Sequence, residues 1–232
     1  MKRTLLALLM LLSTPAFAGR PLGTDDAGTV GDRLCQLEAW RDKAKESRGW
    51  VVAPACGLGE FELGLEASRS RQAEGQTETA QSLALKWGPS ALSYGPLSFG
   101  GKIWSGRART SAAAEDESTG YRPVENGALL LGSWALQEDL ALHLNLGLAR
   151  DRVERRNARL GNLALSWNVD ERVMLFGEAM YQQHAGTTQS TGIRLWAIPG
   201  KLGIDLTAAR MAGVRDSASY TVGFGWYGVF GR

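Results

Sequence analysis

Side chains that could carry out chemistry are few in this sequence of 232 residues. It contains two histidines and two cysteines, which are too few for an all-cysteine structural zinc site or for most histidine-based metal sites. The best catalytic candidate is His143, which shares a face of an expected strand with Asn145, while Ser133 and Ser166 lie on neighbouring expected strands. A base beside a serine can activate its hydroxyl as a nucleophile, but no Gly-x-Ser-x-Gly motif is present. We therefore expect no enzyme, no cofactor and no metal site, with His143 a polar residue of a packed interior.

Composition and charge favour an all-β protein that does not bind nucleic acid. Lysine and arginine number 26 against 24 aspartates and glutamates, a formal net charge of +2, whereas a nucleic-acid binder needs a basic surplus to neutralise phosphates. Twenty-nine glycines and eight tryptophans are typical of turns and strands.

The N-terminus has the three parts of a secretory signal peptide. Lys2 and Arg3 are basic, residues 5–12 are apolar, and Ala16-Phe17-Ala18 supplies the small residues at which a signal peptidase cuts. The apolar run is too short to cross a bilayer, which needs about 20 helical residues. We predict a signal peptide over 1–18, cleavage following Ala18 and a location in the bacterial outer membrane.

Apolar and polar residues alternate with a period of two along most of the remaining chain. From Leu140 to Leu148 every second residue is leucine, which places the leucines on one face of a strand. Soluble sandwiches alternate too, but most of the expected strands have ten to thirteen residues, near the ~9–11 that cross a bilayer at a tilt. We predict a single antiparallel outer-membrane β-barrel over 34–232 with about twelve strands, ten to fourteen being compatible with the pattern. The expected strands are 34–43, 48–56, 59–70, 77–88, 96–108, 125–136, 139–151, 158–169, 172–182, 189–198, 201–211 and 218–230.

Short and long connections alternate between these strands, as in bacterial outer-membrane barrels. The expected two-residue turns are Gly57-Leu58, Gln137-Glu138, Asp170-Glu171 and Pro199-Gly200. The expected longer polar loops are 44–47, 71–76, 109–124, 152–157, 183–188 and 212–217.

Polar residues on the inward phase of the strands are expected to line the lumen. We expect a passive channel or binding barrel for small molecules, with a structural or interaction barrel with a plugged lumen as the alternative and a barrel-borne lipid hydrolase ranked after both. In the plugged barrel, Lys102 and Arg194 neutralise acidic neighbours across the interior. The lumen-lining candidates are Glu38, Glu60, Glu62, Glu66, Lys102, His143, Asn145, Asn168, Glu178, Arg194 and Asp205.

The two cysteines fall opposite each other in the first expected hairpin. A turn centred between Lys45 and Glu46 places Cys35 directly across from Cys56. Opposed residues of antiparallel strands have Cα atoms about 4.5 or 5.5 Å apart, which suits a disulfide, and the periplasm is oxidising. We predict a disulfide; two free buried thiols, or a metal pair with ligands from elsewhere, are the alternatives.

The last expected strand alternates aromatic and apolar residues with small ones. This pattern resembles the terminal signal by which the barrel-insertion machinery recognises outer-membrane proteins, although the usual signal ends at its aromatic residue and here Gly231 and Arg232 follow. An amphipathic last strand of a periplasmic sandwich is the alternative. The residues of the expected signal are Tyr220, Val222, Phe224, Trp226 and Phe230.

The membrane supplies the other expected partners. The eight tryptophans fall in expected strands, several near their ends, where such rings favour the membrane–water interface. Basic stretches at 107–109 and 152–156 lie at expected extracellular loop ends, where they are solvated or contact anionic lipopolysaccharide. We expect outer-membrane lipid, lipopolysaccharide and a small-molecule solute as partners.

Residues 19–33 form the expected periplasmic lead-in segment before the barrel. Asp25-Asp26-Ala27-Gly28 is typical of a turn, and it lacks the spaced acids and distal glutamate of a calcium loop. The run Arg-Pro-Leu-Gly-Thr-Asp-Asp-Ala-Gly-Thr at 20–29, followed by Gln-Leu-Glu at 36–38, resembles the outer-membrane transporter family named after the MetA pathway of phenol degradation. Cys35 stands where that pattern has a large apolar residue. The resemblance covers residues 20–38; it implies a barrel for small, often aromatic or apolar, molecules and carries over no catalytic or ligand residue.

Overall fold

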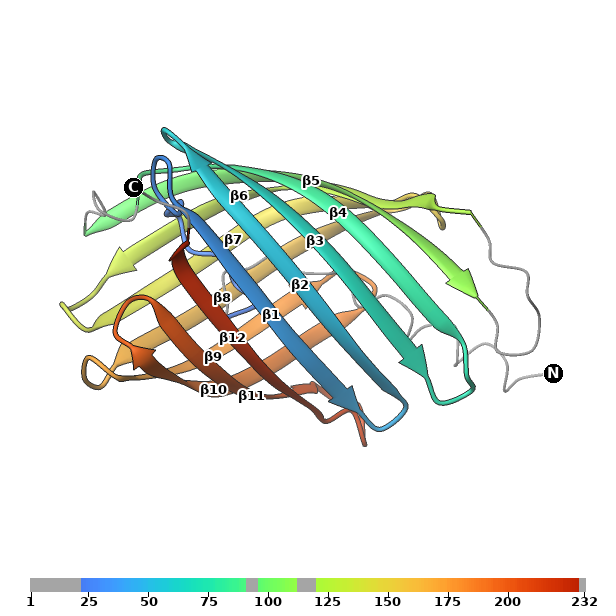
Figure 1. Ribbon diagram of the computed structural model, residues 1–232. Helices are drawn as coiled ribbons and strands as arrows, with labels where there is room; N and C mark the ends of the chain where they lie inside the picture. The colour runs from blue at the N-terminus through green and yellow to red at the C-terminus, as the bar shows by residue number, and fades with distance from the viewer. Residues whose placement is uncertain (1–21, 91–95, 112–119, 230–232) are drawn as a thin grey trace.

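The computed structural model describes residues 22–90, 96–111 and 120–229. The expected signal peptide and Phe230 lie outside these residues. Twelve strands form in the described part of the chain, each antiparallel to its neighbours, and β1 pairs with β12 to close the barrel. The strands tilt strongly across the barrel wall (Figure 1). The predicted fold class and strand number are confirmed. The strands are β1 (Cys35–Ala44), β2 (Ser47–Leu58), β3 (Phe61–Gln72), β4 (Thr77–Trp87), β5 (Leu97–Ser111), β6 (Arg122–Ala135), β7 (Leu140–Asp151), β8 (Asn157–Asn168), β9 (Val173–Gln182), β10 (Gly186–Ile198), β11 (Leu202–Met211) and β12 (Ser219–Val229).

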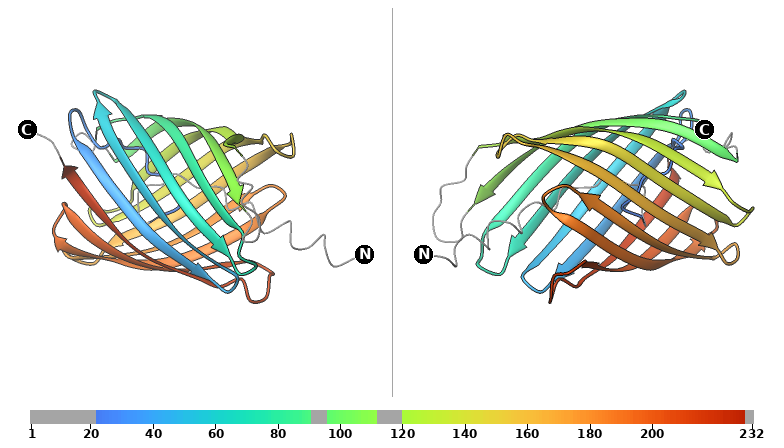
Figure 2. Two further views of the ribbon diagram at one scale, coloured as in Figure 1. Left: turned by 45° about the vertical axis from the view of Figure 1, so that its right-hand side comes forward. Right: turned by 180° about the vertical axis from the view of Figure 1, so that it is seen from behind.

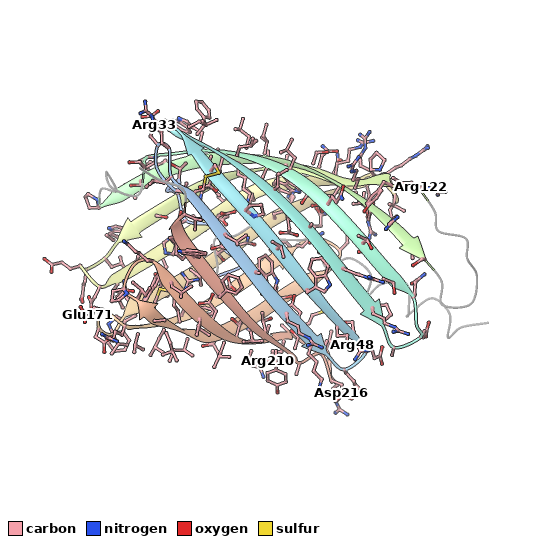
Figure 3. All side chains as sticks on the ribbon, viewed as in Figure 1. Arg33, Arg48, Arg122, Glu171, Arg210 and Asp216 are labelled. Carbon is pink, nitrogen blue, oxygen red and sulfur yellow. A yellow bond between two sulfur atoms is a disulfide. The ribbon has the colours of Figure 1, made fainter. Side chains whose placement is uncertain are left out.

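The two ends of the barrel differ in their connections. At one end, here called the turn end, β2 joins β3 through residues 59–60 and β10 joins β11 through residues 199–201. At the other, the loop end, the longest connection in the sequence spans 112–121, but residues 45–46 between β1 and β2 are as short as a turn. The alternation of connection lengths is therefore less regular than predicted. Figure 3 places Arg33 and Glu171 at the turn end, and Arg48, Arg122, Arg210 and Asp216 at the loop end.

The wall is apolar outside and polar inside, the reverse of a soluble protein. On β7, Leu144 faces outward with 45% of its surface exposed, whereas Asn145 faces inward and is fully buried. The period of two makes each strand present one kind of residue to each side of the wall. The wall thus offers its hydrophobic surface to the surroundings of the barrel.

Tryptophans divide between the two faces. Trp87, Trp134, Trp167 and Trp226 face outward near the turn end, and Trp50 faces outward near the loop end. The indole N–H groups of Trp87 and Trp167 donate to carboxylates of the nearby turns, Glu60 and Asp139. Such rings, apolar on one side and hydrogen-bonded on the other, suit a membrane–water interface. The remaining tryptophans, Trp40, Trp104 and Trp196, lie on the inward phase of their strands.

The predicted disulfide between Cys35 and Cys56 is present. The two residues are direct partners in the register of β1 and β2. Both lie on the outward phase, since Ala55, the next residue on β2, is buried inside. The bond joins the two strands at the turn end, on the outer surface.

Residues 22–31 pass inside the barrel and residues 32–34 lie at its turn end; we call the segment 22–34 the plug. Figures 1 and 2 show it within the wall of strands, ahead of β1. Thr24, Asp25, Ala27 and Thr29 are buried there. The segment was predicted to lie before the barrel, because turn-forming residues do not show whether a chain folds back into a cavity.

Candidate functional site

Asp25 is the central charge of the plug. Its Oδ2 lies 2.6 Å from Nζ of Lys102 and its Oδ1 lies 3.5 Å from Nζ of Lys86. Lys86 and Lys102 are direct partners in the register of β4 and β5, so their ammonium groups enter the lumen side by side. Asp26 adds an ion pair of 3.1 Å to Lys86. Removal of both carboxylates would leave two buried cations next to each other, which is costly.

The plug backbone is held by side chains from several strands of the wall. Glu178 accepts hydrogen bonds from the backbone N–H groups of Gly23 and Thr24, at 2.9 and 2.7 Å, and from the Thr24 hydroxyl at 2.9 Å. Asn145 both accepts from the Asp25 N–H and donates to the Asp25 carbonyl, each at 2.8 Å. On β3, Glu62 accepts from the Val30 N–H at 2.8 Å. These bonds satisfy backbone groups that the plug, which is not a strand of the wall, would otherwise bury unpaired.

His143 belongs to a short chain of hydrogen bonds beneath the plug. Its Nδ1 lies 2.8 Å from Oγ of Ser133 and its Nε2 lies 3.2 Å from Oγ of Ser166. The Ser133 oxygen also accepts the Ala27 N–H at 2.9 Å, and Ser133 is fully buried. A serine occupies the place where a hydrolytic triad has an acid behind the histidine. In this arrangement the Ser133 hydroxyl is covered by the plug and positions it.

Glycine lets the plug approach the wall closely. A Cβ on Gly57 would collide with the Gly31 carbonyl, and a Cβ on Gly88 with the Ala27 carbonyl. Gly57 exchanges backbone hydrogen bonds with Arg33 and Leu34 at the turn end. The plug backbone therefore contacts the wall at positions occupied by glycine, where a side chain would collide with it.

A second cluster occupies the lumen beside β1, β10, β11 and β12. Arg194 makes two hydrogen bonds, of 2.7 and 2.8 Å, to the carboxylate of Asp205. Its guanidinium lies over the rings of Trp196 and Tyr227, 4.8 and 5.2 Å from their centroids. The Tyr227 hydroxyl donates to Glu38 at 2.7 Å. This cluster joins inward side chains of all four strands.

The predicted lumen residues take three positions. Lys102, Asn145 and Glu178 bind the plug directly, as does the half-buried Glu62, and His143 acts on it through Ser133. Glu60 and Asn168 are exposed at the turn end and do not reach this part of the lumen. Lys86 and Ser190 also lie on the inward phase of their strands, but they were not among the predicted lumen residues. The other predicted residues, Glu38, Glu66, Arg194 and Asp205, are buried in the lumen.

A cavity of about 40 Å³ remains between the plug and the wall. Asp25, Glu38, Glu66 and Lys102 are among its lining residues. It has room for a small number of water molecules. Among the described residues, no set of three or more His, Cys, Asp or Glu side chains is arranged to hold a metal ion, and no helix is long and apolar enough to cross a membrane.

Solved structures share this architecture at low sequence identity. The KdgM porin superimposes with a TM-score of 0.57 at 12% identity, covering 82% of this chain and 98% of the porin. The NanC porin gives a TM-score of 0.55 at 8% identity, covering 83% of this chain and 98% of the porin. At such identities the likeness shows a shared barrel fold. None of the curated protein sequences matches this one. The family model described as "Uncharacterised conserved protein UCP029691" matches residues 6–223, and the chain belongs to that family.

Proposed function

We propose that this protein is an outer-membrane channel for small polar solutes, closed by its N-terminal plug and opened when the plug moves. The observation that carries the proposal is the set of polar contacts between the plug and inward side chains of β3, β4, β5, β6, β7 and β9. They cross the bore from one wall to the other.

The outer surface supports the membrane location. Leucine, isoleucine and valine side chains are exposed around the wall, and outward tryptophans stand near both ends, as in transmembrane barrels. Export through cleavage following Ala18, and insertion through the signal in the last strand, belong to this proposal. So does contact with outer-membrane lipid and lipopolysaccharide.

The contacts between the plug and the wall are of a kind that would allow the plug to leave the lumen. They are hydrogen bonds and ion pairs, each worth about 0.5–3 kcal/mol net because water offers replacements. The plug buries two apolar side chains, Leu22 and Ala27, and Leu22 clusters with Ala164 and Phe176. The two cysteines bind each other, so the disulfide leaves the plug untethered.

The lining favours polar or charged solutes. The charged and polar side chains that are buried on the inward face carry carboxylate, ammonium, guanidinium, amide and hydroxyl groups, and such groups can replace the hydration shell of a polar molecule. The resemblance of residues 20–38 to the MetA-pathway family implies apolar or aromatic solutes, whereas the charged groups of the lining favour polar ones.

A permanently closed structural barrel is the second candidate. It is favoured by Asp25, which neutralises two lysines that its departure would leave unpaired. In that case the plug is part of the folded core of the barrel rather than a gate.

Single-channel recording in planar bilayers tests the proposal. Asp25→Asn keeps the size of the side chain but removes the charge that both lysines face, so we expect its open probability to rise about tenfold over the unaltered protein. The control is Asp216→Asn, which removes an exposed ion pair to Lys45 at the loop end and should conduct like the unaltered protein. The Asp216 carboxylate raises the pKa of Lys45 by hydrogen bonding to it, at a site remote from the plug.

The recordings also separate the two candidates. Silence from both the unaltered protein and Asp25→Asn, with each folded in the bilayer, would favour the structural barrel. An equal rise in the Asp216→Asn control would show that the plug is not the gate.

A further inference from the structure

The outer wall carries a cross-strand row of polar and basic side chains near the loop end. Trp50 on β2 pairs in register with Arg69 on β3, Arg69 with Thr79 on β4, and Thr79 with Arg109 on β5. All four lie on the outward phase, because Glu66, Ser82 and Lys102 define the inward phase of β3, β4 and β5. Neighbouring strands are about 4.8 Å apart, so the two arginines flank the threonine within the reach of one anionic group.

This row lines a groove. Its volume is about 300 Å³, and Trp50, Arg69, Thr77, Thr79, Arg109 and Ser111 form its sides. Hydroxyl and guanidinium donors therefore surround the groove, with one aromatic ring at its edge. Trp50 is 46% exposed.

The arginines are available to a ligand. Within the described parts of the chain, neither Arg69 nor Arg109 makes an ion pair. Arg109 lies over the Tyr121 ring at 5.2 Å, and its neighbour Arg107 donates to Gln81 and lies over the same ring at 5.1 Å. The ring contact orients the Arg109 guanidinium while leaving its charge unneutralised.

The charged side chains on the outer surface of β1 to β5 are basic. No acidic side chain faces outward from the described residues of β1 to β5, whose acids all lie on the inward phase. Closer to the turn end, the same strands expose apolar residues such as Leu65 and Leu83. The border between apolar and basic rows is the place where lipid tails meet headgroups. Arg48 marks this end of the wall in Figure 3. The outward basic residues are Arg41, Lys43, Arg48, Arg69, Arg71, Arg107 and Arg109.

We infer that this groove binds the phosphorylated headgroup of a lipid in the outer leaflet, an inference that rests on the proposed membrane location. Arg69 and Arg109 bind the phosphate oxygens with charge-assisted hydrogen bonds, and Thr79 donates its hydroxyl between them. Trp50 packs against the sugar or the first acyl carbons at the interface. The bound lipid would stay with its phosphate in the groove and its acyl chains along the leucines of β3 and β4.

Lipid retention measured by native mass spectrometry tests this site. The full chain, released from detergent micelles with bisphosphorylated lipid A, should retain one lipid molecule. We expect the apparent Kd to rise at least about tenfold in Arg69→Gln/Arg109→Gln. The matched control is Arg150→Gln/Arg159→Gln, which removes two outward arginines from β7 and β8 that do not line the groove. Its Kd should stay within about twofold of the unaltered protein.

Chemically modified probes identify the recognised group. Lipid A stripped of both phosphates should bind at least about tenfold more weakly than the bisphosphorylated form, whereas equal binding would overturn the inference in favour of acyl-chain contact. An equal loss of lipid affinity in both double variants would show that the basic wall attracts the phosphates in general and that the groove is not a specific site. Complete displacement of the lipid by millimolar inorganic phosphate would make the groove a free-anion site and overturn the lipid assignment.

Insertion of the same variants into phospholipid vesicles keeps this result separate from the proposed function. If the unaltered protein fails to insert, the membrane location is wrong. If it inserts and conducts but shows no preference for phosphorylated lipid, only the groove assignment is wrong.

Discussion

Arg194 and Asp205 show how this barrel places charge in its interior. Both are buried, they face each other in the register of β10 and β11, and the guanidinium is covered by Trp196 and Tyr227. A buried pair of this kind contributes little compared with apolar residues of the same shape, but the loss of one partner is expensive.

This asymmetry predicts the effect of substitutions at the pair. Asp205→Ala should lower the free energy of unfolding by about 3–5 kcal/mol, since it strands a buried guanidinium. The double variant Arg194→Met/Asp205→Leu should lose much less, because it removes both charges. Urea unfolding followed by tryptophan fluorescence measures both. A double variant as unstable as the single one would show that packing around Arg194, and not its charge, dominates.

At the scale of the strand, β7 shows the division between the two faces most clearly. Leu144, Leu146 and Leu148 are exposed outside, while His143 and Asn145 are buried inside. The alternation thus separates the surface offered to lipid from the contacts with the plug.

The outward face of β7 can be tested with charge. Leu144→Arg, near the middle of the apolar surface, should lower the free energy of unfolding from vesicles by about 2–4 kcal/mol, because a charge at the bilayer midplane is poorly solvated. Leu140→Arg on the same face, at the turn end, should cost about 0–1 kcal/mol. Urea midpoints in phospholipid vesicles compare the two. Equal midpoints would contradict the proposed position of the membrane.

For the whole molecule, the plug and the wall have separate roles. The wall is held by ladder hydrogen bonds between neighbouring strands around the full circle, whereas the plug meets it mainly through side chains. We therefore expect the barrel to close without the plug, although Lys86 and Lys102 would then lose the carboxylates of Asp25 and Asp26.

Deletion of residues 22–30 should leave a folded barrel that conducts. We expect compact, heat-modifiable migration on gels, together with a conductance higher than that of the unaltered chain, since the contacts that cross the bore are gone. Lys86→Met/Lys102→Met in the same background should restore stability lost to the unpaired cations. Failure of both deletion variants to fold would mean that the plug belongs to the folding core.

Several features of the fold follow from local order along the chain. Twelve strands, the outward facing of Leu144 and the Cys35–Cys56 pairing all follow from a period of two along each strand and from hairpins between consecutive strands. In such hairpins the turn sets the register of the partner strand. These features depend only on residues that are near one another along the chain, so they can be predicted from the sequence.

The position of the plug and the chemistry of the lumen depend instead on contacts between residues that are far apart in the chain. Asp25 meets Lys86, Lys102 and Asn145 across 61, 77 and 120 residues of chain. No periodicity encodes such contacts, because the segment from 22 to 34 pairs mainly with side chains rather than with a strand in register. Closure of β1 on β12 creates the enclosed space, and the buried lysines and carboxylates within it then require a partner. The plug supplies that partner, which is why turn-like residues ahead of the first strand lie at the centre of the molecule.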